Sequence, residues 1–406
     1  MATAIVLAGV SAGVIGITMA LLLEGFEWLF YGVAQGSLPE RVMAAPTWRR
    51  ILAPAAGGVL AGALWWWLRA TGGVTGVTAA VRDGDGEAAS RMGIPRPFGD
   101  AVIQVLTVGS GNSVGREGAP RLAAGAVAAR LSAWLLLDAS LMRSLIAAAA
   151  GAGLGAMYNA PLGGAAYAVE IVMVSGIRRR GVLLAVPVSV IAVVVSWIHS
   201  RGHPTFQVAT VAPSAATLWA LLLLIPLAAG LGAGSRGLWV WARTHRLKDG
   251  WALPCGIAVA GLATGLVSLW LPMVPGNGRD AMAVARGMAL AMLLGVVALK
   301  PLLTALTLGA GAEGGLLAPS FGVGASAGAA LAGALQMMGL DVSVTTLAFA
   351  GAAAMLAVTQ RAPVFGIVFI WELARPDLWV LGVLVVVAVG ALLLARGSWL
   401  DALFRR

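Results

Sequence analysis

Long apolar runs alternate with short polar connections from one end of the chain to the other. The candidate membrane helices are Ala2 to Leu23, Ile51 to Trp67, Leu183 to Ile198, Leu218 to Leu231, Ile257 to Leu271, Met288 to Leu308 and Trp379 to Leu394. Several of these runs are shorter than the roughly 20 residues that a helix needs to cross a bilayer at a right angle. The pattern therefore predicts an all-α integral membrane protein whose helices include tilted and broken ones.

Composition supports this fold class. Hydrophobic residues make up 60% of the chain and charged residues 11%, with a mean hydropathy of +0.91, whereas soluble domains are about 25% charged. The one cysteine, Cys255, excludes a disulfide framework and a thiolate metal cluster. We therefore expect neither a metal nor a cofactor.

The formal net charge of +10 comes from basic residues that are scattered over short loops. Because they do not gather on one surface, we expect no nucleic-acid partner. By the positive-inside rule, Arg178 to Arg180, Arg243 to Lys248 and Arg405 with Arg406 mark the cytoplasmic side. Trp65 to Trp67 and Trp28 are interpreted as anchors at the membrane interface.

A glycine-flanked pair of charges, Arg116 and Glu117, lies inside an almost uncharged stretch, within Gly115 to Pro120. Ionisable residues inside a membrane segment indicate a functional site. The glycines favour a broken helix, whose first backbone amides can bind an anion. Glu117 would then be a tethered anion that occupies this site or leaves it when protonated, which is how a gate works. A buried ion pair that caps a helix is the alternative.

An internal repeat is the most informative feature of the chain. Asn159-Ala160-Pro161 is followed nine residues after its proline by Glu170, and Arg361-Ala362-Pro363 is followed at the same distance by Glu372. The two copies are 202 residues apart. Such an offset indicates two related halves.

A second glycine-rich turn, Gly314 to Pro319, corresponds to Gly115 to Pro120, and the last prolines of the two segments are 199 residues apart. Paired repeats with a broken helix at matching places are typical of transporters, and the substrate site lies where the repeats meet. We therefore predict a first membrane repeat over residues 1–205 and a second over residues 206–406, with inverted topology if each holds an odd number of spans.

One motif suggests an enzyme instead. Gly324 to Gly328 matches the G-x-S-x-G pattern of serine hydrolases, with Ser326 as the nucleophile, but so does Gly9 to Gly13. The three histidines lie in or beside polar connections, so no base for an intramembrane hydrolase is evident. We therefore expect the chain not to be an enzyme, and we interpret both motifs as close helix packing through small residues.

The segments Gly115 to Gly118 and Gly315 to Pro319, with the two Ala-Pro segments and their glutamates behind them, resemble the CLC family of chloride channels and chloride/proton antiporters. Pro46 to Arg50 and Gly276 to Gly278 are similar to the short ClcB-type bacterial branch of that family. The resemblance implies a multi-pass homodimer in the bacterial inner membrane, in contact with lipid and without a cytoplasmic regulatory domain. Each subunit would hold its own chloride pathway.

The resemblance also implies two anion sites at helix N-termini. The amides of Leu316 and Leu317 would line the central site, and those of Arg116, Glu117 and Gly118 the outer one. Glu117 would be the gating glutamate. Together with Glu170, it would also lie on the proton path. The alternative for Glu170 is a structural one, as an interfacial partner of Arg178 or Arg179.

The chain departs from the family pattern at four positions. Gly73 stands where the family has an anion-binding serine, and Leu400 where it has an anion-binding tyrosine. Leu317 replaces a phenylalanine, and Ile171 stands where exchangers usually carry a second inner acid. These departures favour channel-like or weakly proton-coupled chloride transport over fully coupled antiport. A fluoride exporter is less expected, because the asparagine-rich first motif of the fluoride branch is missing.

Overall fold

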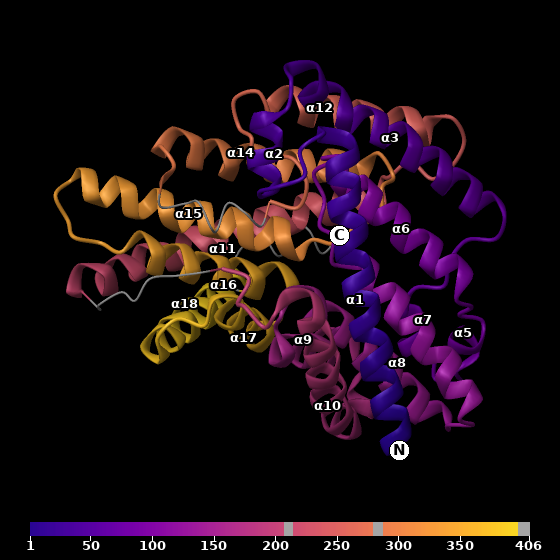
Figure 1. Ribbon diagram of the computed structural model, residues 1–406. Helices are drawn as coiled ribbons and strands as arrows, with labels where there is room; N and C mark the ends of the chain where they lie inside the picture. The colour runs from indigo at the N-terminus through magenta and orange to yellow at the C-terminus, as the bar shows by residue number, and fades with distance from the viewer. Residues whose placement is uncertain (207–213, 279–286, 397–406) are drawn as a thin grey trace. The chain divides into compact units, whose positions relative to one another are not determined.

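A computed structural model describes residues 1–206, 214–278 and 287–396, and Figure 1 shows that these segments are helical. The helices are α1 (Ala2–Tyr31), α2 (Leu38–Ala44), α3 (Thr47–Ala70), α4 (Val77–Arg82), α5 (Glu87–Ser90), α6 (Pro95–Gly109), α7 (Gly118–Trp134), α8 (Ala139–Tyr158), α9 (Pro161–Tyr167), the π-helix η1 (Ala168–Val172), α10 (Ser175–Ser200), α11 (Ala215–Thr244), α12 (Ala252–Val267), α14 (Leu290–Gly309), α15 (Leu317–Met337), α16 (Val344–Gln360), α17 (Pro363–Ala374) and α18 (Leu378–Arg396). These ranges contain no β-strand beyond one isolated bridge. The predicted all-α fold is confirmed.

Within the described ranges, eight helices are long and apolar enough to cross a membrane. They are α1, α3, α8, residues 181–200 of α10, α11, α14, α15 and α18. Six of them contain apolar runs that the sequence predicted. The run from Ile257 to Leu271 forms instead the 16-residue helix α12 and the turn after it. The chain is thus a multi-pass integral membrane protein.

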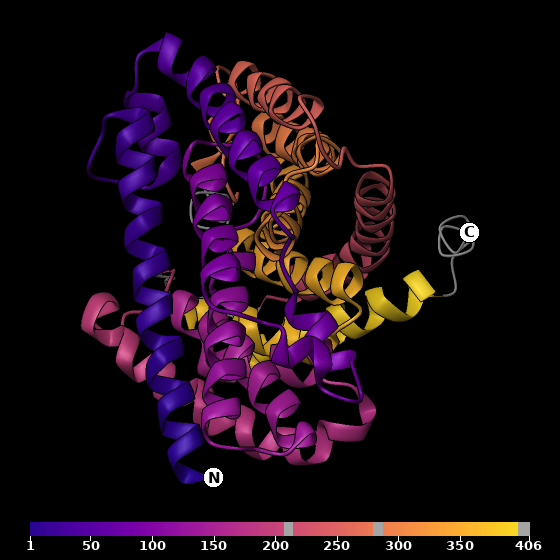
Figure 2. The same ribbon diagram turned by 90° about the vertical axis from the view of Figure 1, so that its right-hand side faces the viewer.

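The chain forms two compact units. Unit 1 consists of residues 1–25, 64–106 and 117–205, and unit 2 of residues 26–63, 107–116 and 206–406. The boundary between the units falls within α1, which is one continuous helix in Figure 2. Residues up to 25 of this helix belong to unit 1, and the rest belong to unit 2. The predicted repeat boundary between residues 205 and 206 stays a prediction, because a compact unit is not by itself a repeat.

Unit 1 is built around α8, which packs against α7 and α10. Small residues allow the helices to approach closely: a Cβ atom at Gly153 would lie 2.6 Å from the carbonyl oxygen of Pro120 in α7. Gly9 and Gly13 of α1 lie in the same way against α10, where an added Cβ would lie 2.7 Å from Ile191 and 2.6 Å from the Ala192 carbonyl, respectively. The first G-x-S-x-G match is therefore a helix-packing surface.

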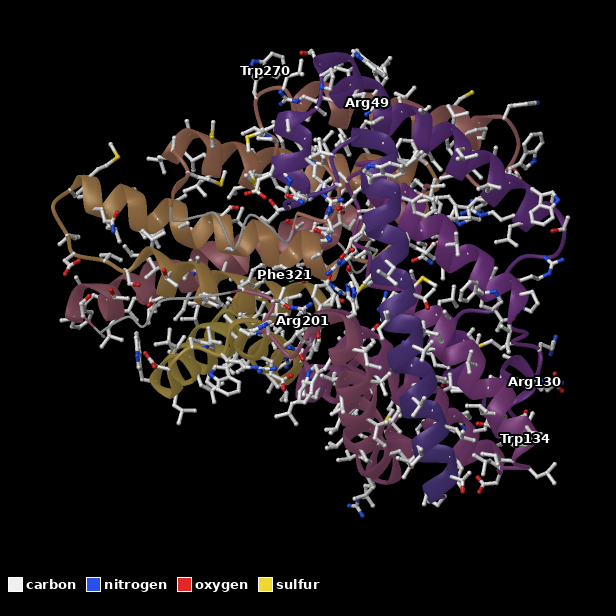
Figure 3. All side chains as sticks on the ribbon, viewed as in Figure 1. Arg49, Arg130, Trp134, Arg201, Trp270 and Phe321 are labelled. Atoms are coloured by element: carbon white, nitrogen blue, oxygen red, sulfur yellow. The ribbon has the colours of Figure 1, made fainter. Side chains whose placement is uncertain are left out.

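Unit 2 is built around α15 and α16, which cross at facing glycines. A Cβ atom at Gly324 would lie 2.3 Å from the Gly351 carbonyl oxygen, and one at Gly351 would lie 2.2 Å from that of Gly324. Ser326 is fully buried, and its hydroxyl donates to the Gly322 carbonyl one turn earlier at 2.9 Å. Phe321 of the same helix, labelled in Figure 3, packs against Phe369 with ring centroids 6.3 Å apart. The second G-x-S-x-G match is thus also a packing motif.

The tryptophan cluster is split between the core and the surface. Trp65 is buried, and its indole N–H donates to the Asp100 carboxylate at 2.7 Å. Trp67 and Trp28 are exposed, as membrane anchors are. The prediction that Trp65 is an interfacial anchor was wrong, because a nearby buried acid offered the indole a partner inside unit 1.

Candidate functional site

The helices that follow the two glycine-rich turns begin in the same way. Glu117 is the N-cap of α7 and Leu316 the N-cap of α15, both with helical backbone angles. Each helix carries proline at its third position, Pro120 and Pro319, which has no N–H to donate. In these described segments neither N-cap residue makes a side-chain cap hydrogen bond. Helix N-termini of this kind are suited to bind an anion.

The two glycine-rich turns are joined in unit 2. The Gly115 amide donates to the Gly315 carbonyl and the Gly315 amide to the Gly115 carbonyl, both at 2.8 Å. A Cβ atom at Gly314 would lie 2.3 Å from the Val114 side chain, so glycine is needed for this approach. Arg116 and Leu316 follow the paired glycines directly. The structure thus brings together the backbone segments that lead into both predicted anion sites.

A buried lysine supports the first turn. Lys300 of α14 is 1% exposed, and its Nζ donates to the carbonyls of Val274 and Gly276 at 2.6 Å each. The Gly276 amide in turn donates to the carbonyl of Gly111 at 2.9 Å. The loop Gly276 to Gly278 is therefore a brace between α14 and the segment that leads to Gly115. Lys300 was not among the residues singled out in the sequence, although it is a charged residue within an apolar run.

Two arginines of the predicted cytoplasmic connection support the second turn. Arg243 donates to the Gly314 carbonyl at 2.7 Å, and Arg246 forms an ion pair with Glu313. Arg178 and Arg243 are exposed. Arg243 and Arg246 therefore have a structural function, whereas the assignment of residues 243–248 to the cytoplasmic side stays a prediction.

The predicted gate is buried. Glu117 is 0% exposed and Arg116 5% exposed. Arg116 belongs to unit 2 with the paired glycines, whereas Glu117 and Gly118 start α7 in unit 1. The Glu117 carbonyl accepts a hydrogen bond from Nε of Arg121 at 2.7 Å. Arg121 was not among the residues that the sequence singled out.

Gly73 lies in the connection between α3 and α4. Its φ angle is +68°, and nothing lies within 4 Å of the position of a Cβ atom. Arg96 donates to the carbonyls of Thr71 and Gly73 and thereby holds the turn. Because the left-handed backbone favours glycine, a serine here would be strained although space is present. Leu400, the other position that lacks a hydroxyl, lies outside the described residues, as do Arg405 and Arg406.

The two repeated glutamates lie in different backbone. Glu170 is half-buried within the π-helix η1, and Glu372 is 5% exposed within the α-helix α17. π-Helical turns often occur at functional sites. The difference distinguishes Glu170 as the candidate for proton transfer.

The acids of the loop after α4 have local partners. The Asp83 carboxylate accepts the Ala88 N–H at 2.6 Å, and this hydrogen bond holds the pKa of Asp83 below its ordinary value. Glu87 pairs with Arg91 at 2.6 Å, and both are exposed. Among the described residues no group of three His, Cys, Asp or Glu side chains could hold a metal ion.

Comparisons with known proteins identify the family. The sequence profile of the voltage gated chloride channel family matches residues 57–396. The chain is 30% identical to a protein of Citrobacter koseri named voltage-gated ClC-type chloride channel ClcB, with 97% of each chain covered. It is also 30% identical to the protein of that name from Escherichia coli O9:H4, again with 97% of each chain covered.

Two solved structures have the same fold. One is a slow cyanobacterial Cl-/H+ antiporter, with a TM-score of 0.81 and 22% identity over 100% of this chain and 97% of that chain. The other is a CLC-type fluoride/proton antiporter, with a TM-score of 0.75 and 19% identity over 97% and 94% of the two chains. At these identities the likeness extends to the fold alone.

Proposed function

We propose that this chain, which belongs to the voltage-gated chloride channel (CLC) family, moves chloride across the bacterial inner membrane through one pathway in each subunit of a homodimer. The observation that carries the proposal is the joining of the two glycine-rich segments within unit 2 by the reciprocal Gly115–Gly315 hydrogen bonds. A bare chloride ion in hydrocarbon would cost tens of kcal/mol. Backbone amides and helix dipoles offset this cost without binding the ion too tightly to leave.

Glu117 is the proposed gate. Its position as N-cap of α7 puts a carboxylate where the helix favours negative charge, so the side chain competes with a transported anion. Protonation makes the side chain neutral and removes its preference for that place. The amides of Arg116, Glu117 and Gly118 form the outer anion site, and those of Leu316 and Leu317 the central one.

The test is chloride efflux from proteoliposomes between acidic and neutral pH. In Glu117→Gln the efflux rate becomes independent of pH, because the amide resembles the protonated acid and does not titrate in this range. The matched control is Glu87→Gln, which changes an exposed acid of unit 1 and keeps the wild-type pH profile. A Glu117→Gln protein with an unaltered pH profile would remove Glu117 from the gating role.

Coupling to protons is proposed to be weak. Ile171 stands beside Glu170 where a second inner acid is expected, and Gly73 and Leu400 bring no side-chain hydroxyl to the central site. If the backbone amides of Leu316 and Leu317 alone hold chloride at the central site, each missing neutral hydrogen bond weakens binding by roughly 0.5 to 1.5 kcal/mol. Low chloride affinity and channel-like transport follow.

A fully coupled chloride/proton antiporter is the second candidate. The π-turn at Glu170 favours it, since it singles out an acid in the half of the chain that also holds Glu117. Proton movement during chloride flux separates the two candidates.

A further inference from the structure

An arginine and a tyrosine meet beside the start of α7. Arg121 donates through Nε to the Glu117 carbonyl at 2.7 Å, and its Nη1 donates to the Tyr167 hydroxyl. The guanidinium carbon also lies over the Tyr167 ring, 5.0 Å from the centroid. One side chain therefore connects the N-cap of α7 with the last residue of α9, and all three residues belong to unit 1.

The position of Arg121 is unfavourable for a positive charge, so the side chain needs compensating contacts. It lies in the first turn of a helix, where the helix dipole disfavours a cation, and inside an apolar stretch. Tyr167 is 5% exposed, so its hydroxyl needs a partner. The planar guanidinium has donors that point in different directions, and this geometry allows it to bind the carbonyl and the hydroxyl together.

The bridge acts on two elements of the proposed transport mechanism. Because a peptide unit is planar, holding the Glu117 carbonyl also fixes the direction of the Gly118 N–H, one of the proposed donors to the outer anion. At the other end, Tyr167 is followed directly by the π-helix that contains Glu170.

We propose that Arg121 and Tyr167 are positioning residues that fix the Glu117–Gly118 peptide to the π-turn of Glu170. The inference rests on the proposed anion site and gate. It predicts that full chloride flux needs the Tyr167 hydroxyl and an Arg121 side chain that donates to two partners at once.

The experiment compares chloride efflux of five variants in proteoliposomes. Arg121→Gln lowers the rate about tenfold and Tyr167→Phe about threefold, because the phenyl ring keeps its contact but loses the hydroxyl. The double variant is no slower than Arg121→Gln, since both changes break one bridge. Arg121→Lys stays within about twofold of Arg121→Gln, because a lysine is a point charge. Arg130→Gln, at the exposed far part of α7 (Figure 3), keeps the wild-type rate.

Folding is checked by size-exclusion elution and thermal unfolding in detergent. If Arg121→Gln does not fold, Tyr167→Phe tests the bridge alone, because it nearly conserves the volume of the side chain. Wild-type flux in Arg121→Lys would overturn the bridge, because it would show that charge alone suffices. Multiplying effects in the double variant would also overturn it.

The result for Glu117→Gln keeps the two proposals apart. If that variant loses its pH dependence while Tyr167→Phe and Arg121→Gln keep full flux, the gate stands and the bridge is wrong. If Glu117→Gln keeps its pH dependence while the two bridge variants are slow and non-multiplying, the bridge stands as a support of the anion helix and the gate is wrong.

Discussion

The two Ala-Pro corners have nearly the same backbone, although they belong to different units. Asn159 and Arg361 end their helices in the left-handed region, with φ, ψ of 53°, 43° and 56°, 35°. Ala160 and Ala362 follow at −128°, 80° and −135°, 80°. In both corners proline then starts the next helix, where its fixed φ is favourable. The conformation is therefore set by the short shared segment.

The corners diverge seven residues later. After Tyr167 the first copy becomes π-helical, and Glu170 is half-buried there. The second copy stays α-helical to Ala374, and Glu372 is buried. The repeated segment Asn-Ala-Pro or Arg-Ala-Pro therefore sets the conformation of the corner, whereas the backbone around the acid is specific to each half.

The largest expected effect is on stability, and it distinguishes Glu372 from Glu170. A buried carboxylate needs its partners, and removing one member of such a group costs about 3 to 5 kcal/mol. Glu372→Ala should therefore lower the free energy of unfolding by an amount in that range, whereas Glu170→Ala should cost less than about 1 kcal/mol. Thermal unfolding of detergent-solubilised protein, followed by size exclusion, measures both. Equal losses in the two variants would contradict the difference in burial.

The helices that end at the two corners, α8 and α16, supply the next test. Gly151 lies where the second copy has Ala353, and a Cβ atom at Gly151 would lie 2.2 Å from the Gly164 carbonyl oxygen. Gly151→Ala should destabilise the protein by about 1 to 3 kcal/mol, because backbone must move. The reverse change, Ala353→Gly, should cost only about 1 kcal/mol through helix propensity. Thermal unfolding that ranks them in the opposite order would show that the corners differ in another way.

The left-handed residues give a smaller difference. The Asn159 amide donates to the His203 carbonyl at 2.6 Å and accepts from the Trp197 indole at 2.8 Å. Asn159→Ala should cost about 1 to 2 kcal/mol, since it removes both hydrogen bonds from a position that also disfavours alanine. Arg361→Asn should stay within about 0.5 kcal/mol of wild type, because asparagine tolerates this backbone. Urea titration of the two variants in mild detergent checks the order, and a costly Arg361→Asn would contradict it.

Hydropathy found six of the eight candidate membrane helices in the described residues and missed the two that are most buried. The helices α8 and α15 are rich in alanine and glycine, and 72% and 83% of their most apolar windows are buried. Close packing selects small residues, which have low hydropathy, so the most enclosed spans gave the weakest signal. The glycine-rich motifs compensated in part, since they indicated the starts of α7 and α15 without a hydropathy assignment.

The candidate site was predictable where it depends on backbone and was missed where it depends on tertiary contact. Glycine and proline spacing indicated the starts of α7 and α15. Lys300 and Arg121 could not be found from glycine and proline spacing. Lys300 donates to the Val274 carbonyl, which is distant in the sequence. Arg121 donates to the backbone carbonyl of Glu117 and to the distant Tyr167 hydroxyl, and neither contact leaves a sequence pattern. Charged residues within apolar runs were the available signal for both.

The smallest expected effect concerns proton coupling through Glu170. An exchanger must bring protons from the inside to Glu117, and Ile171 cannot carry them. Glu313 is an unsuitable relay because it forms an ion pair with Arg246, which leaves Glu170 and a chain of water molecules. Because the site lacks the second acid, we expect an imposed chloride gradient to drive little uphill proton movement. We expect Glu170→Gln to change chloride efflux less than about twofold, since it conserves the shape of the side chain.

The measurement is external pH in lightly buffered proteoliposomes when valinomycin starts chloride flux. Glu313→Gln is the matched control, because it neutralises an acid that is already paired. A robust proton transient at a fixed ratio to chloride would contradict weak coupling and favour the antiporter. Loss of that transient in Glu170→Gln alone would then assign the π-turn of the first corner to proton transfer, whereas its survival in both variants would leave water as the carrier.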